Sequence, residues 1–262
     1  MNLHELLKIF FFAFTQGLTE FLPVSSSGHL VLLNKLFSNA FHSLSYDIFL
    51  HVATFFSVIV FFFKDIKALF FDNRKWILFI IVGTIPAGVI GVLFKDVIEE
   101  LFQGKNSYLL SISFLITSFL VFYSGSKIKT LDPSKEDHKV LDIRKAFIIG
   151  VFQAFAIVPG ISRSGATISA AILLGLAPTR AFVFSFLISL PAIGGAFILQ
   201  LIKSDEMFIG IDSTGLIISF ITAFAVGVSA LYLLKNSIVK KHYKYFSYYT
   251  VVLAVLLLFL FV

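Results

Sequence analysis

The stretch QGLTEFLPVSSSGH, residues 16–29, places a glutamate, a proline, three serines and a histidine inside an otherwise apolar region. The apolar pieces on either side are each too short to cross a bilayer, because a spanning helix needs roughly 17–25 residues. Non-helical backbone is tolerated at membrane depth only where it is buried in protein or lines a wet cavity. The sequence therefore predicts a re-entrant helix–loop–helix hairpin over about residues 3–37.

The chain as a whole has the composition of an integral membrane protein. Of its 262 residues, 58% are hydrophobic and only 14% are charged, whereas about a quarter of the residues of soluble domains are charged. No polar stretch is long enough for a soluble domain, so we expect one membrane domain over residues 1–262. The basic residues behind the net charge of +6 lie in short loops, which argues against nucleic acid as a partner. The lack of cysteine excludes structural disulfides.

Six uninterrupted apolar runs are long enough to cross the bilayer. They are Asp47–Phe63, Trp76–Phe94, Ser107–Ser126, Ala181–Ile202, Leu216–Leu234 and Tyr245–Val262. A further apolar region, residues 143–176, is broken in the middle by PGISRSG, residues 159–165. This region predicts a second re-entrant hairpin.

The two breaks resemble each other, which indicates an internal duplication. QGLTEFLPVSSSG, residues 16–28, aligns without a gap to QAFAIVPGISRSG, residues 153–165. The identities are few, but each break opens the same series of one hairpin and three spans. We therefore expect a first repeat over residues 1–126, a linker over 127–142 and a second repeat over 143–262.

A repeat with three full spans returns its second copy in the opposite orientation. Fifteen Lys and Arg residues fall on one side of the predicted topology and five on the other. The Lys/Arg-rich side is expected to be cytoplasmic, so both termini are predicted outside and the linker inside. The predicted fold class is an all-α polytopic membrane protein with an inverted repeat. The functional site of such folds lies near the midplane, where the broken helices meet.

Serines in both breaks favour an anion site between the hairpin tips. Ser25–Ser27 and Ser162–Ser164 precede half-helices that we predict to begin at His29 and near Ala166. Serines cap the free amides of a helix, and a helix N-terminus attracts anions through those amides. Two such termini would point into one pocket if the tips meet.

Three further residues make phosphate the expected anion. Gly28 and Gly165 would let the backbone approach an oxyanion closely. Arg163 offers the fork of donors that suits phosphate, and an arginine inside a membrane needs an anionic partner. The breaks therefore predict a phosphate pocket.

Reactive groups stand beside this pocket. Ser26 is a candidate nucleophile, His29 a candidate general acid or base, and Glu20 a candidate base or metal ligand. Gln16 and Glu20 lie on one face of a helix, and their oxygens would suit Mg²⁺ or Ca²⁺.

Structural explanations compete with each of these assignments. Serines in membrane helices often serve only packing or capping, Glu20 could belong to a proton relay, and Arg163 could be a structural counter-ion to Glu20. His51 and Thr54, one turn apart, are interpreted as hydrogen-bonding within the helix bundle.

Both motifs together resemble a known family. EFLPVSSSGH, residues 20–29, followed by PGISRSGAT, residues 159–167, is similar to the undecaprenyl-diphosphate phosphatase family of the bacitracin-resistance type. The resemblance covers essentially the whole chain. It implies an enzyme of the bacterial cytoplasmic (inner) membrane that hydrolyses undecaprenyl diphosphate to undecaprenyl phosphate, the carrier lipid for peptidoglycan and other surface polysaccharides. It also implies dependence on a divalent cation. The Lys/Arg asymmetry makes the first hairpin an entry from outside, so we expect the site to open to the external face.

Site residues follow by motif position. The acidic motif falls on Gln16 and Glu20. The serine–glycine–histidine motif falls on Ser25, Ser26, Ser27 and His29, and the arginine motif falls on Ser162, Arg163, Ser164 and Thr167. Many members carry glutamate where this chain has Gln16, which puts a charged metal ligand at that position in doubt. Whether Glu20 or His29 is the base, and whether Ser26, His29 or water attacks, is open at this level.

A second hypothesis is a transporter or flippase of the carrier lipid, because inverted repeats with broken helices are typical of secondary transporters. The set of Ser26, His29 and Glu20 favours an enzyme, since a pure transporter has no need of it. The sequence leaves the oligomeric state open, with a homodimer among the alternatives.

Overall fold

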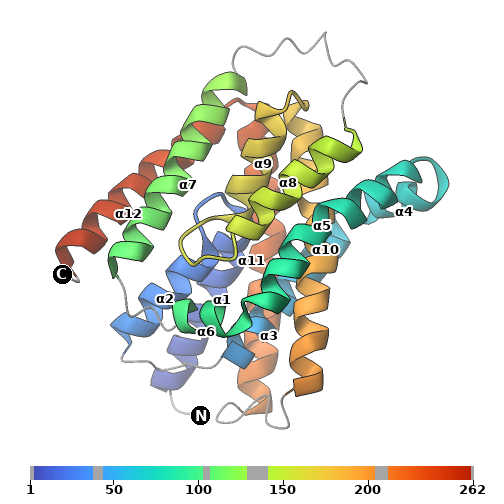
Figure 1. Cartoon of the computed structure of the whole chain (residues 1–262). Coiled ribbons are helices and arrows are strands. Elements are labelled where there is room, and N and C mark those ends of the chain that lie inside the picture. The colour runs from blue at the N-terminus through green and yellow to red at the C-terminus, as the bar shows by residue number, and fades with distance from the viewer. Residues whose placement is uncertain (1–2, 38–43, 103–106, 129–140, 204–211, 261–262) are drawn as a thin grey trace.

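The structure is a computed structural model that describes residues 3–37, 44–102, 107–128, 141–203 and 212–260 (Figure 1). These residues form helices joined by short turns, and no strand occurs among them. The helices are α1 Leu3–Phe21, α2 Ser26–Leu36, α3 Leu44–Phe61, α4 Phe63–Phe71, α5 Lys75–Leu93, α6 Lys95–Phe102, α7 Ser107–Ile128, α8 Ile143–Phe155, α9 Arg163–Leu173, α10 Pro178–Lys203, α11 Ser213–Val239 and α12 Phe246–Leu260. The prediction of an all-α polytopic membrane protein is confirmed.

Two helix pairs correspond to the predicted hairpins. The helices α1 and α2 are joined by residues 22–25, and α8 and α9 by residues 156–162. With 11 residues each, α2 and α9 are too short to cross a bilayer. The predicted starts of these two helices at His29 and Ala166 were wrong. The helices begin three residues earlier, because Ser25 and Ser162 alone act as N-caps.

Four of the six predicted spans are single helices of sufficient length and apolarity: α5, α7, α10 and α11. The first predicted span bends by 65° at Phe62 and continues as α4. The bend has a physical reason: Lys64, Asp65 and Lys67 of α4 are polar, while its Phe70 and Phe71 are exposed. Such a helix suits the membrane surface better than the apolar layer. The last predicted span, α12, has 15 described residues and is shorter than a usual span.

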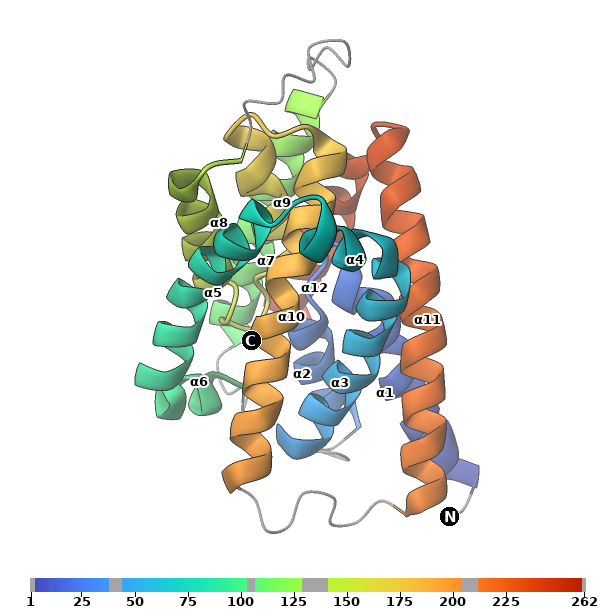
Figure 2. The same ribbon diagram turned by 90° about the vertical axis from the view of Figure 1, so that its right-hand side faces the viewer.

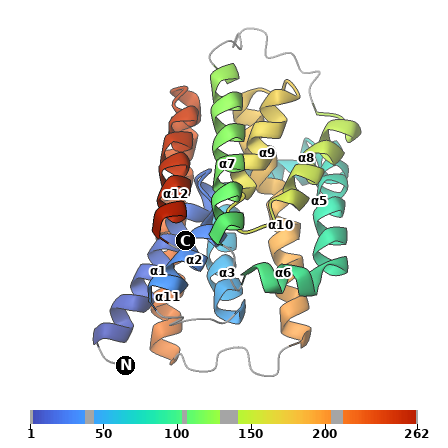
Figure 3. The same ribbon diagram turned by 60° about the vertical axis from the view of Figure 1, so that its left-hand side comes forward.

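Helices of one half of the chain pack against helices of the other half. The first hairpin helix of each half lies against the second span of the other half, so α1 packs on α11 and α8 packs on α5. Likewise α3 packs on α11 and α10 packs on α5. The pairs α3–α10 (Figure 2) and α7–α12 (Figures 1 and 3) join equivalent helices. This exchange is what an inverted repeat requires, whereas the repeat boundaries themselves stay a prediction.

The buried core anchors the tip of the first hairpin to the second half. Phe21, the last residue of α1, packs its ring at 5.5 Å from that of Phe186 on α10. Phe186 in turn stacks at 5.5 Å on Phe62, at the bend between α3 and α4. These three rings are almost completely buried, so the loop of residues 22–25 that follows Phe21 has a fixed starting point.

Candidate active site

The tips of the two hairpins meet inside the protein. The Ser164 hydroxyl at the start of α9 donates a hydrogen bond of 3.2 Å to the Leu22 carbonyl in the first loop. Gly28 of α2 lies so close to Gly160 of the second loop that a Cβ atom on Gly28 would come within 3.0 Å of the Gly160 Cα. Residues from both breaks therefore share one buried site.

The two tips are capped in the same way. The Gly28 amide donates to the Ser25 hydroxyl at 3.3 Å, and the Gly165 amide donates to the Ser162 hydroxyl at 3.1 Å. Ser25 has a positive φ of 69°, which is uncommon outside glycine and turns the chain sharply into α2. Equivalent residues of the aligned breaks thus have equivalent roles in the structure.

In each tip a second serine, Ser27 or Ser164, lies close to the capping serine. The Ser25 and Ser27 hydroxyls are 3.3 Å apart, and those of Ser162 and Ser164 are 3.2 Å apart.

Gly28 and Gly165 have structural reasons to be glycine. A Cβ on Gly28 would also lie 2.6 Å from the Phe114 ring, and one on Gly165 would lie 3.0 Å from the Ser162 Cβ. Their contact with an oxyanion stays a prediction.

Glu20, at the end of α1, is the centre of the site. Its carboxylate is buried, with a residue exposure of 6%. The Ser26 hydroxyl donates to Oε2 at 2.6 Å, and the Gln16 amide donates to the same oxygen at 3.0 Å. Arg163 Nη2 of α9 donates to the other oxygen, Oε1. The structure therefore brings together Gln16, Glu20, Ser26 and Arg163.

Arg163 and Ser26 are the counterparts of each other in the aligned breaks. Each is the first helical residue after the capping serine of its own hairpin. The two hairpins thus present different chemistry at equivalent positions, a hydroxyl from the first and a guanidinium from the second. Both groups reach the same carboxylate.

His29 lies on α2 but faces another helix. Its Nδ1 lies 2.6 Å from the Ser25 carbonyl and its Nε2 lies 2.7 Å from the Tyr249 hydroxyl of α12. The carbonyl can only accept, so Nδ1 carries the proton and Nε2 accepts from Tyr249 when the ring is neutral. The His29 and Tyr249 rings stack with an interplanar angle of 6°. The contacts described for His29 do not include Glu20 or Ser26.

Thr167 supports the site from behind. Its hydroxyl donates to the Arg163 carbonyl at 2.8 Å and lies 2.5 Å from the Ser185 hydroxyl of α10. These bonds tie the first turn of α9 to α10. In this state the hydroxyl is engaged within the protein, and phosphate binding by Thr167 stays a prediction.

His51 and Tyr249 are the contacts that sequence reasoning missed. His51 Nδ1 does bond within α3, to the Asp47 carbonyl at 2.7 Å, but its Nε2 lies 3.3 Å from Oε2 of Glu20. A buried carboxylate needs partners, which is the one sequence signal that could have prompted a search for a histidine on a neighbouring span. Tyr249 had no such signal.

One feature beside Glu20 fits a divalent cation. Gln16 Oε1 is buried and has no hydrogen-bond partner, so an oxygen ligand stands free next to a carboxylate. No group of three or more His, Asp or Glu side chains suited to a metal occurs within the described ranges. A cation here would need further ligands from a bound phosphate.

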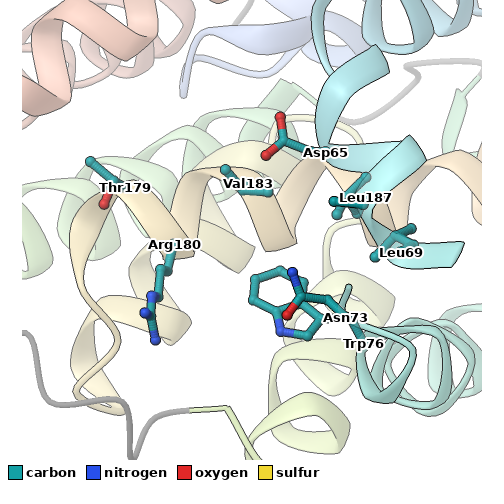
Figure 4. A pocket seen from close by; sticks show the side chains of 9 residues that line it. Asp65, Leu69, Asn73, Trp76, Thr179, Arg180, Val183 and Leu187 are labelled. Atoms are coloured by element: carbon teal, nitrogen blue, oxygen red, sulfur yellow. The ribbon is translucent and has the colours of Figure 1, made fainter. Parts of the chain in front are cut away.

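A cavity of about 240 Å³ lies elsewhere, between α4, α5 and α10. Asp65 and Arg180 line it from different helices, and the Trp76 ring forms part of its wall (Figure 4). None of the predicted site residues lines this cavity. The sequence motifs and the cavity are thus separate features of the molecule.

Fold and site together define a polytopic membrane protein in which two broken helices join a serine, a carboxylate and an arginine. Residues 9–256 match the family described as bacitracin resistance protein BacA, and the chain belongs to this family. It is 39% identical to an undecaprenyl-diphosphatase of Thermodesulfovibrio yellowstonii, with 98% of each chain covered. It is 41% identical to an undecaprenyl-diphosphatase of Thermosipho africanus, over 93% of this chain and 96% of that one. The resemblance read from the motifs is confirmed.

Proposed function

We propose that this protein is an undecaprenyl-diphosphatase. It hydrolyses undecaprenyl diphosphate to undecaprenyl phosphate and inorganic phosphate, and so recycles the carrier lipid and confers bacitracin resistance. The named relatives support this function over nearly their whole length. The observation that carries it is the bond of 2.6 Å between the Ser26 hydroxyl and the Glu20 carboxylate, whose other oxygen pairs with Arg163.

In the proposed reaction, Ser26 is the nucleophile and Glu20 is its base. The bond of 2.6 Å is within the range for proton transfer from a nucleophile to its base. Ser26 Oγ attacks the terminal phosphorus as its proton passes to Glu20. The bond from that phosphorus to the bridging oxygen breaks, and undecaprenyl phosphate leaves. Water then attacks the phospho-serine, the bond from phosphorus to Ser26 Oγ breaks, and the proton on Glu20 returns to Ser26. The protons of the water leave with the inorganic phosphate.

Arg163 stabilises the charge on the transferring phosphoryl group. Arg163 is the first residue of α9, and amides and the dipole at a helix N-terminus favour anions. Preorganised donors of this kind supply most of the catalysis in phosphoryl transfer. The pairing with Glu20 places the guanidinium close to the nucleophile before the substrate binds.

His29 lies three residues after Ser26 on α2 but has different partners. Its Nε2 is bonded to the half-exposed Tyr249, so the pair connects the site region to the outer surface of α12. We assign His29 to proton exchange with the phosphates or with water, and the Tyr249 hydroxyl to holding its ring.

A Mg²⁺ or Ca²⁺ ion would be held by Gln16 Oε1 and Glu20, together with oxygens of the substrate. Bound there, it would neutralise part of the diphosphate charge. The unpartnered Gln16 oxygen supports this assignment.

The protein acts in the cytoplasmic membrane with its site open to the external face. The Lys/Arg bias of 15 against 5 supports this orientation, and it lets the enzyme meet a substrate released outside without a flip. The arrangement of Ser26, Glu20 and Arg163 suits an enzyme. Both relatives described above carry the name of an enzyme, so we propose no transport function.

Phosphate release from a prenyl diphosphate by the purified protein tests the proposal. The wild-type protein should release inorganic phosphate, and Ser26→Ala should reduce the rate by several hundredfold or more, as expected for loss of a nucleophile. A folded wild-type protein that releases none would refute the function, and an active Ser26→Ala variant would refute the role of Ser26.

A further inference from the structure

Glu20 has two basic partners, although one would neutralise it. Arg163 bonds to Oε1, and His51 Nε2 lies 3.3 Å from Oε2. The partners come from different helices, α9 and α3, and approach different oxygens. The proposed mechanism uses Arg163 and leaves His51 without a role.

Both ring nitrogens of His51 face acceptors. Nδ1 lies 2.7 Å from the Asp47 carbonyl, which can only accept a hydrogen bond. Nε2 faces a carboxylate oxygen, which also accepts. An imidazole that faces an acceptor at each nitrogen can donate to both only when it is protonated, so the contact with Glu20 is an ion pair in that form of the ring. The bond to the Asp47 carbonyl, one turn back on α3, also fixes the direction of the ring.

Arg163 cannot serve Glu20 and the substrate equally well. A diphosphate offers more negative charge than one carboxylate, and the guanidinium fork suits phosphate. When the fork turns to the substrate, the buried Glu20 carboxylate loses the hydrogen bond from Arg163, and the loss of a partner is costly for a buried charge. His51 approaches the same oxygen that accepts the Ser26 proton, so it remains in contact after this exchange.

We propose that His51 is a positioning residue that keeps the Glu20 carboxylate aimed at Ser26 while Arg163 passes to the substrate phosphates. The inference rests on the proposed phosphatase function. It assigns the two basic residues different tasks, with Arg163 movable and His51 fixed.

Binding of farnesyl methylenediphosphonate, a non-hydrolysable prenyl diphosphate analogue, tests the proposal in a double-mutant cycle. His51→Ala should weaken binding by roughly tenfold or more, as expected for loss of a charge-assisted hydrogen bond. In a Glu20→Gln background the same change should alter binding by less than about twofold. His51→Gln, which keeps a donor toward Glu20, should recover most of the loss. Thr54→Val is the matched control, because the Thr54 hydroxyl bonds only to the Leu50 and His51 carbonyls of its own helix in the contacts described.

Thermal unfolding of each variant separates a folding defect from a site effect. If His51→Ala does not fold, His51→Leu, which removes the donor and keeps more of the side-chain volume, carries the test. An equal loss in both backgrounds would overturn the proposal, since His51 would then act on the phosphates directly. If His51→Ala did not weaken binding of the analogue in the protein that keeps Glu20, the proposal would be overturned as well. Phosphate release by the wild-type protein is measured alongside, and its absence would count against the proposed function instead.

Discussion

Side chains from four helices converge on the Glu20 carboxylate, from Gln16, Ser26, His51 and Arg163. Three of these four were predicted as site residues, because each stands in a polar break where an apolar chain offers contrast. His51 was not, since it lies on a regular apolar span and meets Glu20 only through the packing of α3. A local motif reveals a site residue when several polar residues together interrupt an apolar run. A single polar residue within a continuous apolar span gives no such motif.

Arg163→Lys should lose most of the activity although the charge is kept. Lysine cannot reproduce the planar fork that bonds to two oxygens. The expected loss is about 1–3 kcal/mol of transition-state stabilisation, or roughly 5- to 150-fold in kcat/KM. Steady-state phosphate release measures it, with Arg180→Lys at the separate cavity as a control. Near-normal turnover in Arg163→Lys would show that a point charge is sufficient.

Gln16→Glu should retain activity and tighten the apparent affinity for Mg²⁺ or Ca²⁺. The Gln16 amide now donates to Glu20, and a glutamate would replace this donor with a second carboxylate. Two adjacent buried carboxylates favour a divalent cation between them. Titration of activity with each cation after removal by a chelator measures the effect. An unchanged cation dependence would show that position 16 does not contact the metal.

At the scale of elements, the hairpins were predictable and their details were not. The breaks between α1 and α2 and between α8 and α9 lie where polar residues interrupt apolar runs. The serine clusters were interpreted as preceding the helices, but one capping serine is enough to start each helix. Ser26 and Arg163 therefore project from first turns, at positions that the backbone of a helix holds firmly.

Gly28→Ala should separate the hairpin tips and lower activity. The added Cβ would lie 2.6 Å from the Phe114 ring and 3.0 Å from Gly160, and relief of such overpacking costs about 1–3 kcal/mol. Gly88→Ala on α5 is the control, because a Cβ there meets nothing within 4 Å. Phosphate release and thermal unfolding of both variants check this. Equal activity of the two variants would mean that the tips tolerate separation.

At the scale of the whole molecule, the exchange of partners between the halves explains why a site forms at the centre. Neither hairpin holds the complete set, since Ser26 and Glu20 come from one and Arg163 from the other. Weak internal similarity and the repeated series of one hairpin and three spans were enough to predict that the two breaks meet, but not which helices pack against each other. The bend at Phe62 was not predicted, because the apolar run continues through it while the polar residues that reorient α4 begin only at Lys64.

A cysteine at position 27 should react with membrane-impermeant thiol reagents applied from outside. Ser27 is partly exposed, whereas Ser164 is buried, so Ser164→Cys is the control and should react slowly from either side. The chain has no cysteine of its own. Added lipid diphosphate should protect Ser27→Cys. Labelling from the cytoplasmic side alone would reverse the predicted orientation.

Tracing the oxygen of water through the reaction tests the central claim, that this site transfers the terminal phosphoryl group of a lipid diphosphate. The purified protein is given undecaprenyl diphosphate in water enriched in oxygen-18, and both products are analysed by mass spectrometry. Attack at the terminal phosphorus, followed by hydrolysis, places the heavy oxygen in inorganic phosphate and leaves undecaprenyl phosphate unlabelled. Heavy oxygen in undecaprenyl phosphate would contradict the account.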